Sequence, residues 1–269
     1  MKPKDIPKKS FVIKEPLFIK SLKLAKSNSN KTGLMILFDL MFMASLFGLQ
    51  TLFNYAAQNI SLPQTSSIFF VFIAFSLIYY LVVLFVYSFF KYSVLDFISS
   101  LYDISQFSYK RLGQFYSLNI ILAGLFFSMM IFANFILLTV KPDYRPWVFI
   151  AMAVPAGLFF YVFINAAHFI FCQYNSVKKS IVSGLNVTFT KIRAYRETIM
   201  LMIVFALILY MLFYGAGYLL RVLTSKNNVL YLNSYAYFKQ AAILTFDIVF
   251  YFVILINRIS FYKIVRELD

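Results

Sequence analysis

The sequence has little of what soluble enzymes use to build catalytic and metal sites. It contains one cysteine, Cys172, one histidine, His168, and eight glycines among 269 residues. A single cysteine excludes an intramolecular disulfide framework and a cysteine-based zinc site, and a single histidine excludes a paired-histidine metal motif. The glycines are scattered, so no glycine-rich phosphate-binding loop is present. We therefore expect no metal and no cofactor, and we interpret Cys172 as a packing residue.

Charged side chains are also scarce. They make up 13% of the chain, whereas hydrophobic residues make up 62%. Ordinary soluble domains have about 25% charged and about 45–50% apolar residues. A chain this apolar cannot cover its surface with side chains that water solvates well, so most of its solvent must be lipid. The composition predicts an all-α fold, a polytopic transmembrane helix bundle.

Six stretches are long and apolar enough to be transmembrane helices. A helix needs about 20 apolar residues to cross a hydrocarbon core about 30 Å thick. The stretches that meet this requirement are residues 33–58, 67–90, 115–140, 147–172, 198–220 and 237–257. The mostly polar residues before the first stretch favour a retained span over a cleaved signal peptide. We divide the chain into a basic N-terminal segment (1–32), a six-span membrane domain (33–257) and a C-terminal tail (258–269).

The distribution of cations predicts the orientation in the membrane. Of the 25 lysines and arginines, 20 fall in the N-terminal segment, the two long connectors (91–114 and 173–197) and the C-terminal tail. The other five lie on the opposite side, four in the connectors and Lys239 near the outer end of the last span. Positively charged residues stay on the cytoplasmic side of a membrane. We therefore predict a multi-pass protein of the plasma membrane with both termini in the cytoplasm.

The N-terminal segment and the long connectors carry the pattern of amphipathic helices that lie in the membrane interface. In the second connector, Val177, Ile181 and Leu185 recur at helical spacing, opposite a basic face. The candidate contacts to anionic lipid headgroups are Lys20, Lys23, Lys26, Lys178, Lys179, Lys191 and Arg193. Aromatic residues that could stack on bases are nearly absent from the N-terminal segment, so we expect lipid and not nucleic acid as its partner.

The order of these elements indicates three repeats of about 80 residues, each an interfacial helix followed by a transmembrane hairpin. Aligning Lys31, Lys110 and Lys191 brings the sequences around them into register, with spacings of 79 and 81 residues. The alternative is that three hairpins with basic cytoplasmic ends resemble one another because the same topology rules act on each. The identities in the alignment are too few to decide between the two.

Asp247 is the most unusual residue in the predicted spans. It lies near the middle of the last span, where an ionisable side chain costs several kcal/mol. The cations Arg221 and Lys239 lie towards the outer end, more than about 10 Å away along the helix axis. Asp247 is therefore a candidate proton or cation site. The alternative is a hydrogen bond between helices that fixes their packing.

Other polar residues lie closer to the cytoplasmic ends of the spans. Asp39 lies in the first span, and His168 and Asn165 lie at a similar shallow depth in the fourth. If these two spans touch, Asp39 and His168 form a buried pair; otherwise each side chain reaches the interface. Pro155 lies within the fourth span, where we expect it to kink the helix.

These features favour an integral membrane protein without a catalytic site, acting as a scaffold, assembly or lipid-interacting component together with other membrane proteins. The spans carry too few polar residues for a hydrophilic translocation path. The alternative is a transporter or channel-like protein for a small solute or ion, with Asp247 in a polar cavity near Asn134. An intramembrane enzyme using Asp39 and His168 is the least favoured hypothesis, because no nucleophile motif accompanies them.

Overall fold

The computed structural model describes residues 16–59, 66–102, 107–190, 195–224 and 227–268. Within these ranges the regular structure is helical, and no strand is present. The elements in chain order are α1 (Leu17–Ser27), α2 (Ser29–Asn59), α3 (Ser66–Ser99), α4 (Tyr109–Thr139), the 3-10 helix η1 (Pro142–Tyr144), α5 (Arg145–Tyr174), α6 (Val177–Thr190), α7 (Arg196–Thr224) and α8 (Asn228–Leu268). Of the predicted lipid contacts, Lys191 and Arg193 lie outside the described residues.

Six of these helices, α2, α3, α4, α5, α7 and α8, are long and apolar enough to cross a membrane. The predictions of an all-helical fold and of a membrane protein with six candidate spans are therefore confirmed at this level. The helices are longer than the predicted stretches. The 41 residues of α8 extend about 60 Å at 1.5 Å per residue, about twice the thickness of the hydrocarbon core. Residues 258–268, which we expected to be a tail, continue this helix.

Local signals account for several helix ends. α4 begins after Ser108, whose hydroxyl accepts a hydrogen bond from the backbone N–H of Arg111. α5 ends at Asn175, which has a left-handed conformation (φ 52°) that asparagine tolerates well. Pro155 lies inside α5, which is one helix from Arg145 to Tyr174.

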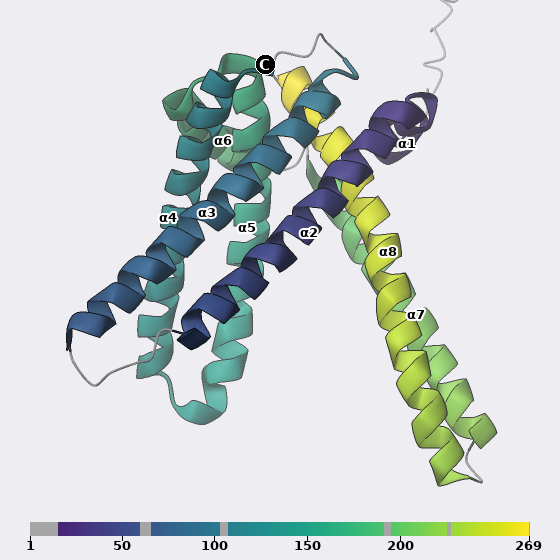
Figure 1. The fold of residues 1–269 in the computed structure, drawn as a ribbon. Coiled ribbons are helices and arrows are strands. Elements are labelled where there is room, and N and C mark those ends of the chain that lie inside the picture. The colour runs from purple at the N-terminus through teal and green to yellow at the C-terminus, as the bar shows by residue number, and fades with distance from the viewer. Residues whose placement is uncertain (1–15, 60–65, 103–106, 191–194, 225–226, 269) are drawn as a thin grey trace, which may run out of the picture.

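The most extensive helix contacts are those of α5 with α6, α7 with α8, α2 with α3 and α3 with α4, and α8 also packs against α1 and α5. Figure 1 shows α1, α6 and the C-terminus at one end of the molecule, which we call the collar end. The C-terminal ends of α2, α4 and α7 and the N-terminal ends of α3, α5 and α8 lie at the opposite end, the tip end. Towards the tip end the α7–α8 pair diverges from α3, α4 and α5 (Figure 1).

The packed core lies at the collar end. Its largest fully buried side chains are Met35, Leu95, Ile98, Phe115, Leu118, Phe163, Phe169, Ile170, Phe171, Tyr195, Leu255 and Phe261. The ring of Tyr195 stacks on Phe261 at 4.9 Å, and burial raises the pKa of the tyrosine. The tip halves of the helices carry most of the exposed apolar side chains. The isolated chain is thus well packed at one end and open at the other.

The short helices at the collar end pack through small residues. On α6 the buried face consists of Ser180, Gly184 and Thr188, and a Cβ at Gly184 would lie 3.2 Å from Ala167 of α5. On α1 the hydroxyl of Ser21 accepts a hydrogen bond from Ser260 of α8 at 2.8 Å. This packing through small residues of α1 and α6 was not predicted from the sequence.

Candidate functional site

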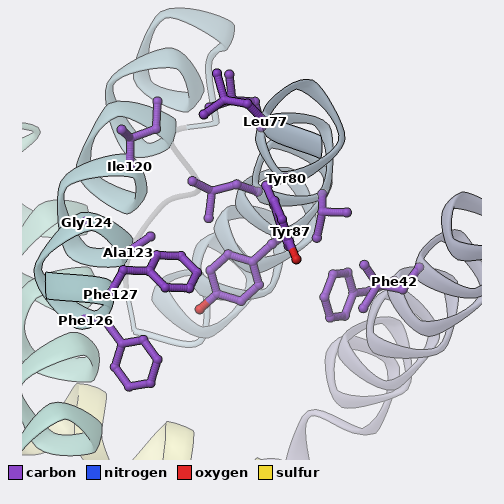
Figure 2. A pocket seen from close by; sticks show the side chains of 13 residues that line it. Phe42, Leu77, Tyr80, Tyr87, Ile120, Ala123, Gly124, Phe126 and Phe127 are labelled. Atoms are coloured by element: carbon purple, nitrogen blue, oxygen red, sulfur yellow. The ribbon is translucent and has the colours of Figure 1, made fainter. Parts of the chain in front are cut away.

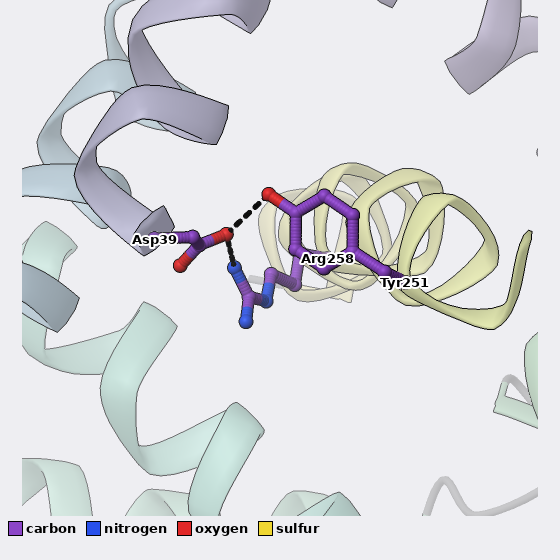
Figure 3. A network of polar contacts seen from close by, with 3 residues as sticks. All are labelled: Asp39, Tyr251 and Arg258. Carbon is purple, nitrogen blue, oxygen red and sulfur yellow. Dashed lines mark hydrogen bonds and ion pairs between the residues drawn. The ribbon is translucent and has the colours of Figure 1, made fainter. Parts of the chain in front are cut away.

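An ion pair joins the first spanning helix to the last. The guanidinium Nη1 of Arg258 lies 2.6 Å from Oδ2 of Asp39, and the hydroxyl of Tyr251 donates to the same oxygen at 2.8 Å. Figure 3 shows the carboxylate of Asp39 on α2 facing both groups on α8. The Arg258 and Asp39 side chains are 20% and 18% exposed, so they remain partly accessible.

Further polar side chains surround this pair. Lys91 of α3 interacts electrostatically with both Asp39 and Arg258. Tyr87, one turn before Lys91, and Tyr161 of α5 also lie within electrostatic range of Arg258. We call Asp39, Tyr87, Lys91, Tyr161, Tyr251 and Arg258 the polar cluster. It contains two basic side chains, one carboxylate and three tyrosines. These residues come from four helices, α2, α3, α5 and α8.

A second set of hydrogen bonds joins α3, α4 and α5. The Nε2 atom of His168 is 2.7 Å from Oδ1 of Asn119, and Nδ2 of Asn119 donates to the hydroxyl of Ser88 at 2.9 Å. His168 is fully buried, and its Nδ1 has no hydrogen-bond partner among the described residues. Asp39 and His168 therefore do not form the pair that was one of the two alternatives, because each side chain has another partner.

Both sets of contacts occur where the apolar stretches end. On the spanning helices, about 20 to 30 mostly apolar residues separate the tip end from a group of polar residues nearer the collar end, which is enough to cross a hydrocarbon core about 30 Å thick. We call this group the polar layer; its members are Asp39, Lys91, Asn119, His168, Thr198 and Arg258. The backbone carbonyl of Thr198 accepts a hydrogen bond from Asn257, next to Arg258, at 3.1 Å. The packed core lies largely on the collar side of the polar layer.

Asp247 lies apart from the polar cluster, on the diverging α7–α8 pair. Its side chain is exposed, and no hydrogen bond or ion pair joins it to another described residue. Its neighbours on α8, Ile243, Leu244 and Ile248, are 52%, 62% and 50% exposed. Asp247 is thus an acidic side chain within an exposed apolar surface.

The remaining predicted polar residues bond within their own helices. Asn165 donates to the carbonyl of Tyr161, and Asn134 donates to the carbonyl of Met130. Asn134 is exposed. These bonds satisfy the asparagine amides locally, so neither residue contributes to the polar cluster.

Most of the predicted lipid-contacting lysines that the structure describes are on the surface. Lys23, Lys26, Lys178 and Lys179 are exposed, and Lys20 is partly exposed. The ammonium of Lys179 lies over the ring of Tyr174, 2.9 Å from its centroid. All five belong to α1 or α6 at the collar end, which therefore presents a basic surface.

Apolar grooves lie between the helices, lined mostly by residues on the tip side of the polar layer. One, of about 450 Å³, lies between α2, α3 and α4, and Tyr87 and Ile120 line it. A second groove of about 280 Å³ between α3, α4 and α5 shares Leu84, Tyr87, Ala123 and Phe126 with the first. Figure 2 shows Tyr87 between Phe42 of α2 and the α4 residues Ala123 and Phe127. Asp247 lines neither groove.

The residues that form the polar cluster were only partly foreseen. Asp39 was recognised because it is a carboxylate inside an apolar stretch, but Arg258 was counted only as a cation of the tail. Lys91 was counted only as a cation of the first connector. Both cations follow an apolar stretch directly, and that shared position is the signal that could have placed them at the same depth as Asp39.

The part of the chain that the structure describes contains no group of His, Cys, Asp and Glu side chains that could hold a metal ion. Comparisons with protein-family models, with curated proteins and with solved structures find no match. Function must therefore be argued from the geometry of this chain.

Proposed function

We propose that this protein is a multi-pass membrane scaffold or assembly component without a catalytic site. In this proposal the collar end faces the cytoplasm, where its basic surface contacts anionic lipid headgroups of the plasma membrane. The three helix pairs act as transmembrane hairpins, and the α7–α8 hairpin binds a transmembrane helix of another protein. The observation that carries the proposal is the exposure of Asp247.

An exposed carboxylate in the middle of a span requires a partner. The cost of an ionisable side chain at the bilayer centre is several kcal/mol, and such residues almost always face other protein groups or water. Asp247 has no such partner among the residues that the structure describes, and it lies among exposed Ile243, Leu244 and Ile248. A second membrane protein that covers this surface would both pair the carboxylate and bury the apolar side chains.

The chemistry of Asp247 defines the partner. A transmembrane helix that carries a lysine, an arginine or a hydrogen-bond donor at the same depth complements the carboxylate. A second copy of this chain related by two-fold symmetry would bring two Asp247 side chains together, and like charges disfavour that arrangement. We therefore propose a partner of different sequence.

The other hypotheses have less support. The transport hypothesis placed Asp247 in a polar cavity near Asn134, but both side chains are exposed and Asn134 bonds within α4. The enzyme hypothesis required Asp39 and His168 to act together, and each has a different partner.

Site-specific photo-crosslinking tests the proposal. A photoreactive amino acid at Leu244, beside Asp247, should form one adduct with one membrane protein in native membranes. Asp247→Leu should abolish this adduct because it removes the paired group, whereas Ile248→Leu should preserve it. The same photoreactive group at Phe132 of α4, which is 65% exposed, is the control for non-specific capture. A chain that yields no adduct at Leu244 and purifies from native membranes as a partner-free monomer would refute the proposal.

A further inference from the structure

The polar cluster has an excess of positive charge. It has two basic side chains for one carboxylate, Asp39: Arg258 forms an ion pair with it, and Lys91 lies within electrostatic range of it. Arg258 uses Nη1 for Asp39, and no hydrogen bond or ion pair joins Lys91 to any residue that the structure describes. A guanidinium has five N–H donors and an ammonium has three, so both residues retain donors for a further acceptor.

The two apolar grooves begin next to this cluster. Tyr87 lines both grooves and lies one helical turn before Lys91 on α3. Residues four apart share a face of a helix, and their side chains lean towards its N-terminus. Lys91 therefore lies on the same face of α3 as Tyr87, one helical turn beyond the groove.

The length of the larger groove matches one leaflet of a bilayer. Along α3 it extends from Tyr87 to Leu77, which is about 15 Å at 1.5 Å per residue. Half of a hydrocarbon core of about 30 Å is the same distance. The groove thus has an apolar wall as long as one acyl layer and a cationic group at the depth where the apolar stretches end.

We propose that the polar cluster and the larger groove together bind one phospholipid with an anionic headgroup. Lys91 and Arg258 bind the phosphate, and one acyl chain lies along α3 between Phe42 and Phe127 (Figure 2). The headgroup complements the excess positive charge, and the acyl chain covers apolar side chains that the protein itself leaves open. This site is separate from Asp247 and does not depend on the proposed partner protein.

The amount of lipid that remains bound to the purified chain tests the proposal. The chain is reconstituted in bilayers of phosphatidylcholine and phosphatidylglycerol at a ratio of about 4:1 and is then released for native mass spectrometry. We expect one phosphatidylglycerol per chain, retained in preference to phosphatidylcholine. Lys91→Met should reduce that preference about fivefold, because one lysine near a phosphate contributes about 1 kcal/mol. Lys141→Met, which removes an exposed lysine at the tip end, should leave it unchanged.

Two glycines of α4 offer a matched test of the groove. Gly124 lines the groove and Gly113 does not, and a Cβ at either position meets nothing within 4 Å. Gly124→Phe should fill the groove and abolish retention of the bound lipid, while Gly113→Phe should preserve it. Both variants should retain the elution volume of the parent chain in size-exclusion chromatography.

Three results would overturn the proposal. The first is equal retention of phosphatidylglycerol and phosphatidylcholine by the parent chain. The second is unchanged retention in both Lys91→Met and Gly124→Phe. The third is displacement of the lipid by millimolar glycerol phosphate, which would identify the cluster as a site for a soluble phosphate and not for a lipid.

Discussion

Arg258 and Asp39 are 219 residues apart in the chain, yet their charged groups are 2.6 Å apart. This contact joins the first spanning helix, α2, to the last, α8. Tyr251 adds a second hydrogen bond from α8 to the same carboxylate. The pair therefore connects the two ends of the membrane domain at the depth of the polar layer.

Breaking this ion pair should destabilise the protein. Asp39→Leu leaves the partly buried guanidinium of Arg258 without its acceptor, and we expect a loss of about 1–3 kcal/mol in the free energy of unfolding. The double variant Asp39→Leu/Arg258→Leu should lose less than the sum of the two single changes. Reversible unfolding in mixed detergent micelles measures the free energy of unfolding of the parent chain, the two single variants and the double variant. Additive losses would show that the two side chains do not interact in the membrane.

Removing the hydrogen bonds of Asn119 should also destabilise the protein. Asn119→Leu removes the partner of His168 Nε2 in a fully buried site, where an unsatisfied polar group costs about 1–3 kcal/mol. Asn134→Leu, on the same helix but exposed and bonded only to its own backbone, is the control. Unfolding of both variants under the same conditions should rank Asn119→Leu as clearly less stable, and equal stabilities would contradict the observed network.

The contact between α5 and α6 should tolerate no larger residue at Gly184. A Cβ there lies 3.2 Å from the backbone of Ala167, so Gly184→Val should force the helices apart and cost about 1–3 kcal/mol. Gly157→Ala on α5, where a Cβ meets nothing within 4 Å, should be neutral or slightly stabilising, because alanine favours a helix. Thermal unfolding distinguishes the two. A fully stable Gly184→Val variant would show that α6 does not pack in this way.

Labelling of introduced cysteines tests the orientation that the cation distribution predicts. In a chain carrying Cys172→Ala, Lys178→Cys at the collar end should react with a membrane-impermeant maleimide only after the cells are permeabilised. Tyr144→Cys at the tip end, where the side chain is 61% exposed, should react in intact cells. The reverse pattern would place the collar end outside.

The sequence predicted the helical fold and the number of candidate spans because hydropathy and length suffice for both. It identified Asp39, His168 and Asp247 because polar residues inside apolar stretches are rare. It could not assign their partners. Whether Asp39 meets His168 or Arg258 depends on which helices are neighbours, and the composition of a span contains no information about that. Gly184 was missed for the same reason, since a small residue is informative only once the opposing helix is known.

The continuity of α8 gives the molecule a mechanical connection between its two ends. One unbroken helix carries Asp247 in its exposed half and Arg258 and Ser260 in the half that packs into the core. Because α8 is one continuous helix, a tilt of its exposed half would also move Arg258 and Ser260, which contact Asp39 and α1. A partner that binds the exposed half of α8, as proposed, would therefore also act on the contacts that α8 makes with Asp39 and with α1.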